Sequence, residues 1–501
     1  MDMYCPSNGM RNSCCDFNLY CTHYLRTNNC GRPHRKALRS SRLAKFYLFT
    51  TPVYLISGRQ NIQTIFSGSH RVGNENLFTD NAFPKLYCMS KEECQRFIDD
   101  TSGRGHVPAP GSEHIPDEHR YWHGYDYVHS EYLGRVQHLR PMAEYFRKRM
   151  TKMLDEQYGM GEWTALSVID FCKGPVAHQS IESMFGPRLF ELSPNVLEAF
   201  WEFDRNIIPL TLGIPKWMYS VPHTAQQHYY GMIRRYLDEA KSGLDCKPAD
   251  ADWDVNFGAR VCREVAKWVS EKKFSDEVAV GAMAMLMIIE VVTDPTLLKA
   301  VREEVATAFT TDPETGSRTV IVEKIVTLPL LQSIFTEVLR LRVNFNLMRN
   351  VKESITLDGF TLQKGSLLQA PSVVAHRDES SWASEGHPAT EFWAERHIKY
   401  QDETDEAGNI TRTRKFAMAA RPSGFFPFGG GHSICPGRHF AKQEILTATA
   451  LLISKFDVEV VGWTKFDKSP SDRPAEDDTR FSGAGAQPPD RDLKILLKRL
   501  A

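Results

Sequence analysis

The residues best suited to chemistry lie in one stretch near the C-terminal end, FFPFGGGHSICPGRHFA, at Phe425–Ala441. It contains one cysteine, Cys435, and three consecutive glycines, which can adopt positive φ and let the backbone lie close to a flat ligand. The sequence from Arg438 onward favours a helix, so Cys435 would lie near a helix N-terminus, where free amides and the helix dipole favour thiolate over thiol. A thiolate is a ligand for iron, and on haem iron it favours O–O cleavage. From composition alone, a lone cysteine beside glycines is more often a buried apolar residue or a loop thiol.

A second set of chemically interesting residues lies upstream, in PLLQSIFTEVLRLRV. Glu337 and Arg340 are three residues apart, so on a helix they lie on one side and can form an ion pair. Such pairs are common on protein surfaces and contribute little there. The apolar residues recur at helical spacing and predict a buried face: Leu331, Ile334, Phe335 and Val338.

The spacing around the cysteine is more specific than its composition. Phe428, Gly431, Cys435 and Gly437 stand as F-x-x-G-x-x-x-C-x-G, which closely resembles the haem-ligand signature of the cytochrome P-450 family, the haem-thiolate monooxygenases. The resemblance extends over about residues 46–501. It implies a mainly α fold with a small β region, and haem b between a long distal helix and the cysteine loop. Cys435 would be the axial iron ligand, and Phe428 would pack over the thiolate side.

The resemblance also implies roles for residues elsewhere. Glu337 and Arg340, with Arg396 in AERH, match the family's buried Glu-Arg-Arg cluster, which is structural and holds the chain before the cysteine loop. Arg349 lies where the family anchors a haem propionate. Two segments correspond to the lining of the substrate pocket: Val343–Leu347 and Ala484–Gln487.

The second propionate contact is not assigned. Ser433 replaces the basic residue that most of the family has two positions before the cysteine. Arg120, Trp122 and His129 are all candidates, and each is also explained as an ordinary surface or core residue. Ser433 and the C-terminal sequence resemble the sterol-hydroxylase and prostacyclin-synthase-like branch, including fungal members.

The distal helix departs from the family pattern. Its acid–alcohol pair, which relays protons to dioxygen, would fall on Val278 and Ala279, and neither can carry a proton. A helix starting at Ser275 would also be short, about 30 Å up to Pro295. We therefore expect no distal catalytic residue, and a chain that has lost segments through evolution or a faulty gene model.

Taken together, the resemblance implies hydroxylation of a small apolar molecule, in secondary metabolism, with O₂ and electrons from an NADPH–cytochrome reductase. Arg438, His439 and Lys442 would either dock that acidic partner or form a solvated helix face. Two alternatives stay open. One is a haem-thiolate isomerase or dehydratase that needs no reductase, and the other is a non-catalytic remnant with a truncated distal helix.

The composition restricts the class of protein and the partners it can have. The chain has 501 residues, 42% apolar and 25% charged, with net charge -1, which is ordinary for a globular protein and does not indicate a nucleic-acid partner. We expect a monomer. Residues 46–501 form the predicted domain, whereas residues 1–45 are expected to lack order, with a zinc or disulfide site as the alternative. That alternative rests on Cys5, Cys14, Cys15, Cys21, Cys30 and His23.

No membrane-spanning run is visible in the sequence. The longest apolar runs, Phe46–Gly58 and Val278–Ile289, are shorter than the ~18–20 residues that a spanning helix needs. The resemblance implies the cytosolic face of the endoplasmic reticulum membrane, and a cytoplasmic location stays open.

Local patterns predict several elements. PVYLISG, beginning at Pro52, is typical of a strand, and the following RQNIQTIF of a helix. Tyr125–Leu154 is expected to be helical. Asp294 is a helix N-cap followed by proline, and Asp358-Gly359 is typical of a hairpin turn.

Overall fold

The computed structural model describes residues 38, 41–48, 50–67, 71–242, 251–272, 290–311, 313, 318–404, 408–418 and 423–500. The N-terminal cysteines Cys5 to Cys30 and His23 lie outside these residues. So do Ser275, Val278, Ala279 and the run Val278–Ile289.

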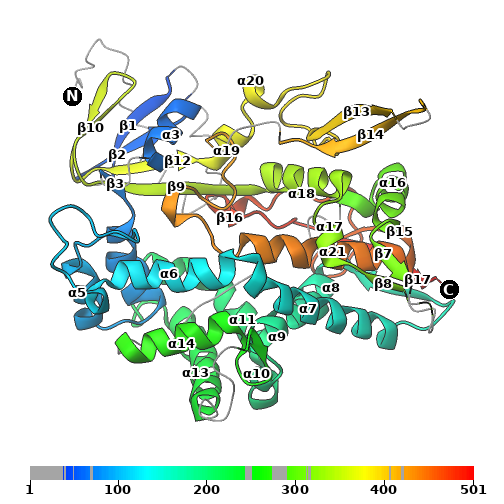
Figure 1. Cartoon of the computed structure of the whole chain (residues 1–501), viewed down its shortest axis with the longest axis horizontal. Coiled ribbons are helices and arrows are strands. Elements are labelled where there is room, and N and C mark those ends of the chain that lie inside the picture. The colour runs from blue at the N-terminus through cyan, green and yellow to red at the C-terminus, as the bar shows by residue number, and fades with distance from the viewer. Residues whose placement is uncertain are drawn as a thin grey trace.

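Helices make up most of the molecule, and β-sheets lie at its margins (Figure 1). The longer helices are α5 (Lys91–Asp99), α6 (Tyr121–Gly134), α7 (Val136–Gln157), α9 (Ala177–Phe185), α11 (Val196–Arg205), α13 (Ser220–Ser242), α14 (Arg260–Lys272), α16 (Pro295–Ala306), α18 (Pro329–Arg342) and α21 (Arg438–Lys455). Short helices connect them: α4 (Glu75–Leu77), α8 (Val168–Phe171), α10 (Arg188–Leu192), α12 (Ile207–Thr211), α17 (Val322–Ile325), α19 (Ser372–His376) and α20 (Glu379–Trp382).

The largest sheet has the strand order β1-β2-β12-β9-β16, with β3 (Val72–Gly73) also paired to β9. Its strands are β1 (Leu43–Leu48), β2 (Thr51–Ile56), β9 (Val343–Val351), β12 (Leu367–Pro371) and β16 (Ala484–Ala486). β12 runs parallel to β2 and antiparallel to β9. The helix α3 (Arg59–Ser67) follows β2, as predicted, and its Ile62 and Ile65 join the apolar core of this sheet.

Smaller sheets complete the β region. β4 (Trp163–Ser167), β15 (Phe456–Thr464) and β17 (Asp492–Arg499) form a three-stranded sheet. The remaining pairs are β5 (Trp253–Asp254) with β6 (Gly258–Ala259), β7 (Phe309–Thr311) with β8 (Arg318–Val320), β10 (Ile355–Leu357) with β11 (Phe360–Leu362), and β13 (Ile398–Thr404) with β14 (Ile410–Phe416). The mainly α architecture with a small β region is therefore confirmed.

The main core lies around α21, which runs between α18 and α7 in Figure 1. Its buried side chains include Leu446, Leu451 and Ile453, and they join residues of α7, α16 and α18 in one apolar cluster. Because α21 is buried over most of its length, the position of its N-terminus is fixed by packing. The loop that precedes α21 is therefore anchored at that end.

Most local predictions are confirmed. Asp294 caps α16 with its carboxylate and Pro295 follows, and Asp358 and Gly359 form the β10–β11 turn with φ of 47° and 78°. The helix expected over Tyr125–Leu154 is instead two helices, since Gly134 ends α6 and Arg135 is extended, with φ -99° and ψ 130°. β1 begins at Leu43, three residues before the expected domain start. No helix within the described ranges has both the length and the apolar character needed to cross a membrane.

Candidate functional site

The cysteine loop is shaped by its own backbone. The amide of Cys435 donates to the carbonyl of Phe428 at 2.9 Å, and that of Gly429 donates to Phe426 at 3.0 Å. Gly429 and Gly431 have φ of +77° and +66°, a conformation that other residues rarely adopt. α21 begins three residues after Cys435, as predicted, with Gly437 as its N-cap residue. Cys435 is exposed, so its thiol lies on a surface of the loop and not in the core.

The glycines of the cysteine loop lie against different neighbours. A Cβ on Gly437 would lie 4.0 Å from the Cys435 sulfur, so this glycine leaves space beside the thiol. A Cβ on Gly430 would come within 2.1 Å of the Phe66 ring of α3. The sequence placed all three glycines against a flat ligand, but Gly430 is needed for close packing on Phe66. Phe66 also contacts Phe426 edge-on, with ring centroids 5.9 Å apart.

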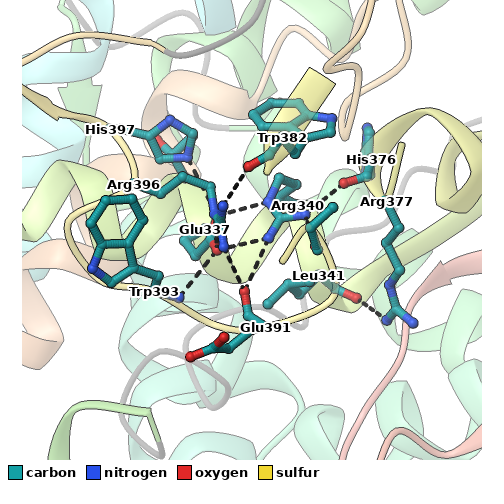
Figure 2. A network of polar contacts seen from close by, with 12 residues as sticks. Glu337, Arg340, Leu341, His376, Arg377, Trp382, Glu391, Trp393, Arg396 and His397 are labelled. Carbon is teal, nitrogen blue, oxygen red and sulfur yellow. Dashed lines mark hydrogen bonds and ion pairs between the residues drawn. The ribbon is translucent and has the colours of Figure 1, made fainter. Parts of the chain in front are cut away.

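The structure brings Glu337, Arg340 and Arg396 together in a fully buried cluster (Figure 2). Both oxygens of Glu337 accept from Arg340 at 2.7 Å, and Arg396 Nε donates to Glu337 at 2.8 Å. Burial raises the pKa of Glu337, but hydrogen bonds from Arg340, His397 and Arg396 outweigh it and lower that pKa to about 2. The carboxylate therefore stays charged at any physiological pH.

The two arginines also hold backbone carbonyls. Arg340 donates to His376 at 2.7 Å, and Arg396 donates to Trp382 and, at 2.9 Å, to Glu391. These carbonyls belong to the segment that runs from the end of α19 through α20 to the loop before β13, and this segment leads toward the cysteine loop. The geometry supports a scaffolding role, since the cluster offers no exposed reactive atom.

His376 was not singled out in the sequence. It is fully buried, and its Nε2 accepts from the amide of Phe426 at 3.0 Å while its carbonyl accepts from Arg340. Burial, with the nearby charge of Arg340, lowers its pKa to about 3, so the ring is neutral. His376 thus connects the cluster to the start of the cysteine loop. A histidine in an apolar stretch was the only sequence signal for it.

Arg349 lies on β9 beside the loop. Its side chain donates to the carbonyl of Met348 at 2.8 Å and to that of Gly430 at 3.0 Å. Burial, and then the charge of Arg104, lower its pKa to about 10. Among the residues that the structure describes, no carboxylate forms an ion pair with it. A buried cation that lacks an anion is costly and matches a ligand carrying carboxylates.

The three residues considered for the second propionate contact make their hydrogen bonds away from the cysteine loop. Arg120 donates to the carbonyls of Gly105 and His106, and the Trp122 indole donates to Phe97. These contacts fix the loop before α6, and the ring of His129 is bonded to the carbonyl of Tyr125. None of these three hydrogen-bonds the cysteine loop. The face of Trp122 is covered by Arg104, which the sequence did not single out.

The two segments matched to the pocket lining do lie together. β16 pairs with β9 in a register that sets Ala484 opposite Phe345 and Ala486 opposite Val343 along the backbone. Their contact with a substrate stays a prediction. The distal positions Val278 and Ala279 lie outside the described residues.

The comparisons with known proteins agree with this geometry. The family model for cytochrome P450 matches residues 139–473. The chain is 40% identical to the cytochrome P450 monooxygenase calL of Penicillium decumbens over 480 residues, which cover 93% of this chain and 88% of that protein. The chain belongs to the cytochrome P450 family.

Relatives of lower identity also match this chain. The chain is 28% identical to the cytochrome P450 monooxygenase fsoE of Humicola fuscoatra, over 68% of this chain and 63% of that protein. It is 26% identical to the cholesterol 7-alpha-monooxygenase of Cricetulus griseus, over 61% of this chain and 59% of that protein. The recognition from the sequence, including the branch with sterol hydroxylases, is confirmed.

A cytochrome P450 is an oxidoreductase with haem as its cofactor, and the residues present fit that group. An exposed thiol lies at a helix N-terminus, and beside the loop lies a buried arginine that has no carboxylate partner among the described residues. Haem held by a cysteine thiolate supplies oxygen activation. Cys435 would hold the iron, and Arg349 would hold a propionate.

Proposed function

We propose that this cytochrome P450 is a haem-thiolate monooxygenase that hydroxylates a small apolar molecule in fungal-type secondary metabolism. It would use O₂ and electrons that an NADPH-dependent reductase supplies. The observation that carries the proposal is Cys435, an exposed cysteine whose amide is bonded back into a positive-φ glycine loop at the start of a buried helix. The names of the fungal relatives support the reaction class.

The decisive test is the absorption spectrum of the reduced protein under carbon monoxide. A strongly red-shifted Soret band is expected for thiolate-bound haem, and Cys435→Ala should abolish it. Cys88→Ala is the matched control, because Cys88 is also exposed but lies far from the loop in sequence. A wild-type protein that folds and binds no haem would refute the proposal.

Reductase dependence is tested separately. With reductase and substrate present, a monooxygenase consumes NADPH in step with product, whereas an isomerase turns over without NADPH. Arg438 and His439 follow the cysteine and remain accessible for an acidic partner. Lys442 is less suited, because its amine donates to Gln332 at 2.6 Å and burial lowers its pKa to about 8. Arg438→Glu should therefore slow reduction at low salt more than Lys442→Gln does.

We also propose that the enzyme works at the cytosolic face of the endoplasmic reticulum membrane. An exposed apolar stretch from α12 into α13 supports this, with Trp217 82%, Met218 62% and Leu212 52% exposed. Other exposed apolar residues of this stretch are Ile208, Tyr219 and Val221. Co-sedimentation with phosphatidylcholine vesicles should fall severalfold in Trp217→Ser/Met218→Ser and not in Phe466→Ser, whose side chain is also exposed but follows β15, far from this stretch in sequence. Equal binding of all three proteins would contradict this location for the contact.

A further inference from the structure

The chain between β15 and β17 contains a loop whose two ends are bonded to each other. The amide of Asp490 donates to the carbonyl of Glu476 at 2.9 Å, and the amide of Glu476 donates to Asp490 Oδ1, also at 2.9 Å. Next to them, Asp477 and Pro489 pair as an isolated antiparallel bridge. A compact loop with closed ends of this kind is an Ω-loop. We call residues 476–490 the C-terminal loop.

The tip of the C-terminal loop lies on the sheet beside the cysteine loop. The tip is β16, with the sequence Ala-Gly-Ala, and its register with β9 sets Ala486 opposite Val343. On β9, Phe345 and Arg349 share a face with Val343, because side chains two residues apart in a strand point to the same side. From that face the Phe345 ring contacts Phe426 with ring centroids 6.2 Å apart, and Arg349 donates to the cysteine loop. The tip therefore borders the space next to the cysteine loop with small residues.

A cluster of four charged side chains holds one end of the C-terminal loop. The carboxylate of Asp477 accepts from Arg342 Nη1 at 2.7 Å and from Arg377 Nη2 at 3.2 Å. Arg342 also donates from Nη2 to Glu290 at 2.5 Å. Burial lowers the pKa of Arg342, but the charges of Glu290 and Asp477 outweigh it and raise that pKa. The side chains of Glu290 and Asp477 are only 16% and 19% exposed, so water screens these ion pairs weakly.

The two arginines of this cluster belong to the frame that holds the cysteine loop. Arg342 is the last residue of α18 and directly precedes β9, and its carbonyl accepts from the amide of Gln487 at 2.8 Å. It therefore binds the C-terminal loop at two points. Arg377 directly follows His376, whose ring bonds the start of the cysteine loop. Through these arginines, Asp477 fixes the C-terminal loop relative to the cysteine loop.

We propose that Asp477, held by Arg342 and Arg377, is a positioning residue that keeps the tip of the C-terminal loop in contact with a bound ligand. The cluster would thereby set the width of the ligand space next to the cysteine loop, and the enzyme would select its ligands by size at this point. This inference rests on the proposed function, since it requires haem. The competing explanation is that the cluster only stabilises the fold.

Two haem ligands of different size separate the two explanations. Imidazole and 4-phenylimidazole both bind ferric haem iron through a nitrogen, and the shift of the Soret band on titration gives each dissociation constant. Asp477→Asn removes the charge between the two arginines, so the loosened tip should lose contact with the phenyl ring and 4-phenylimidazole should bind roughly tenfold more weakly. Imidazole lacks that apolar surface, and its dissociation constant should change by less than about twofold. The matched control is Glu403→Gln, at a carboxylate that is 52% exposed and lies 2.7 Å from Lys415, and it should bind both ligands like wild type.

The ratio of the two dissociation constants decides between the explanations. If Asp477→Asn leaves this ratio unchanged, or binds 4-phenylimidazole more tightly, the inference is overturned while the proposed function stands. If the wild-type protein binds no haem, the proposed function itself fails. If Asp477→Asn does not fold, as judged by circular dichroism, Arg342→Lys is used instead, because lysine keeps the charge but lacks the planar fork that bonds Glu290 and Asp477 together. Its loss should again be severalfold for 4-phenylimidazole and absent for imidazole, and equal losses would overturn the inference.

Discussion

Glu337→Gln should destabilise the protein strongly, because it removes the one carboxylate between two buried arginines. The side chains of Glu337, Arg340 and Arg396 are all 0% exposed. Breaking a buried ion pair from one side costs about 3–5 kcal/mol, out of a total stability of about 5–15 kcal/mol. The glutamine keeps the size of the side chain, so the loss reports charge and hydrogen bonding and not a cavity.

The pKa of Glu337 gives a second value for the free energy of unfolding that this substitution removes. It falls from 4.5 to about 2 on folding, which corresponds to about 3 kcal/mol of stability. Because the folded pKa is depressed, this contribution is fully present above pH 4.5 and is lost as the pH falls toward 2. The free energy from the broken ion pair, about 3–5 kcal/mol, and that from the pKa, about 3 kcal/mol, therefore agree.

The assay is urea unfolding of the purified protein followed by tryptophan fluorescence. At pH 7, Glu337→Gln should unfold with about 3 kcal/mol less free energy than wild type, and the difference should shrink as the pH falls below 4.5. The control Glu353→Gln removes an exposed carboxylate 3.9 Å from Arg71 and should cost less than about 1 kcal/mol. If both variants lose the same small free energy of unfolding, the buried cluster does not stabilise this fold.

Three further perturbations test the surroundings of the cysteine loop. Gly430→Ala should cost about 1–3 kcal/mol because its Cβ would lie 2.1 Å from the Phe66 ring, and adding Phe66→Ala should recover part of that loss in the same unfolding assay. His376→Phe should cost about 1–3 kcal/mol by leaving the buried amide of Phe426 without an acceptor. Since the folded pKa of His376 is depressed to about 3, wild-type stability should fall as the pH drops below 6.5, and the variant should show a smaller fall over that range. Arg349→Gln should leave apoprotein stability unchanged or raised, because it removes a buried cation, yet weaken haem binding roughly tenfold or more in a Soret titration. Equal apoprotein losses for Arg349→Gln and Glu337→Gln would contradict this account of Arg349.

The features that the sequence predicted well depend on short separations along the chain. Glu337 and Arg340 are one helical turn apart, and Cys435 lies three residues before α21, so spacing alone indicates both arrangements. The mainly α architecture and the position of Arg396 came from the resemblance to the family and not from periodicity. A bond between residues 59 apart in sequence has no local pattern.

The features that were missed are contacts between distant segments. Arg104 lies in a loop rich in glycine, proline and histidine, and only folding places it over Trp122 and beside Asn74. The ring of Phe66 explains Gly430, but its helix is more than 360 residues earlier in the chain. Because a glycine that accommodates a ring and one that accommodates a ligand look alike in sequence, the pattern Gly429–Gly431 could not separate them.

These contacts together explain how an exposed thiol is held in a fixed place. Glu337 positions Arg340, Arg340 holds the carbonyl of His376, and the ring of His376 holds the amide of Phe426 at the start of the loop. At the other end, the packing of α21 fixes Gly437. The loop is therefore anchored on both sides by buried groups, so that only its central residues, including Cys435, face outward. An arrangement of this kind orders a metal ligand before the metal arrives, which lowers the entropy that binding must overcome.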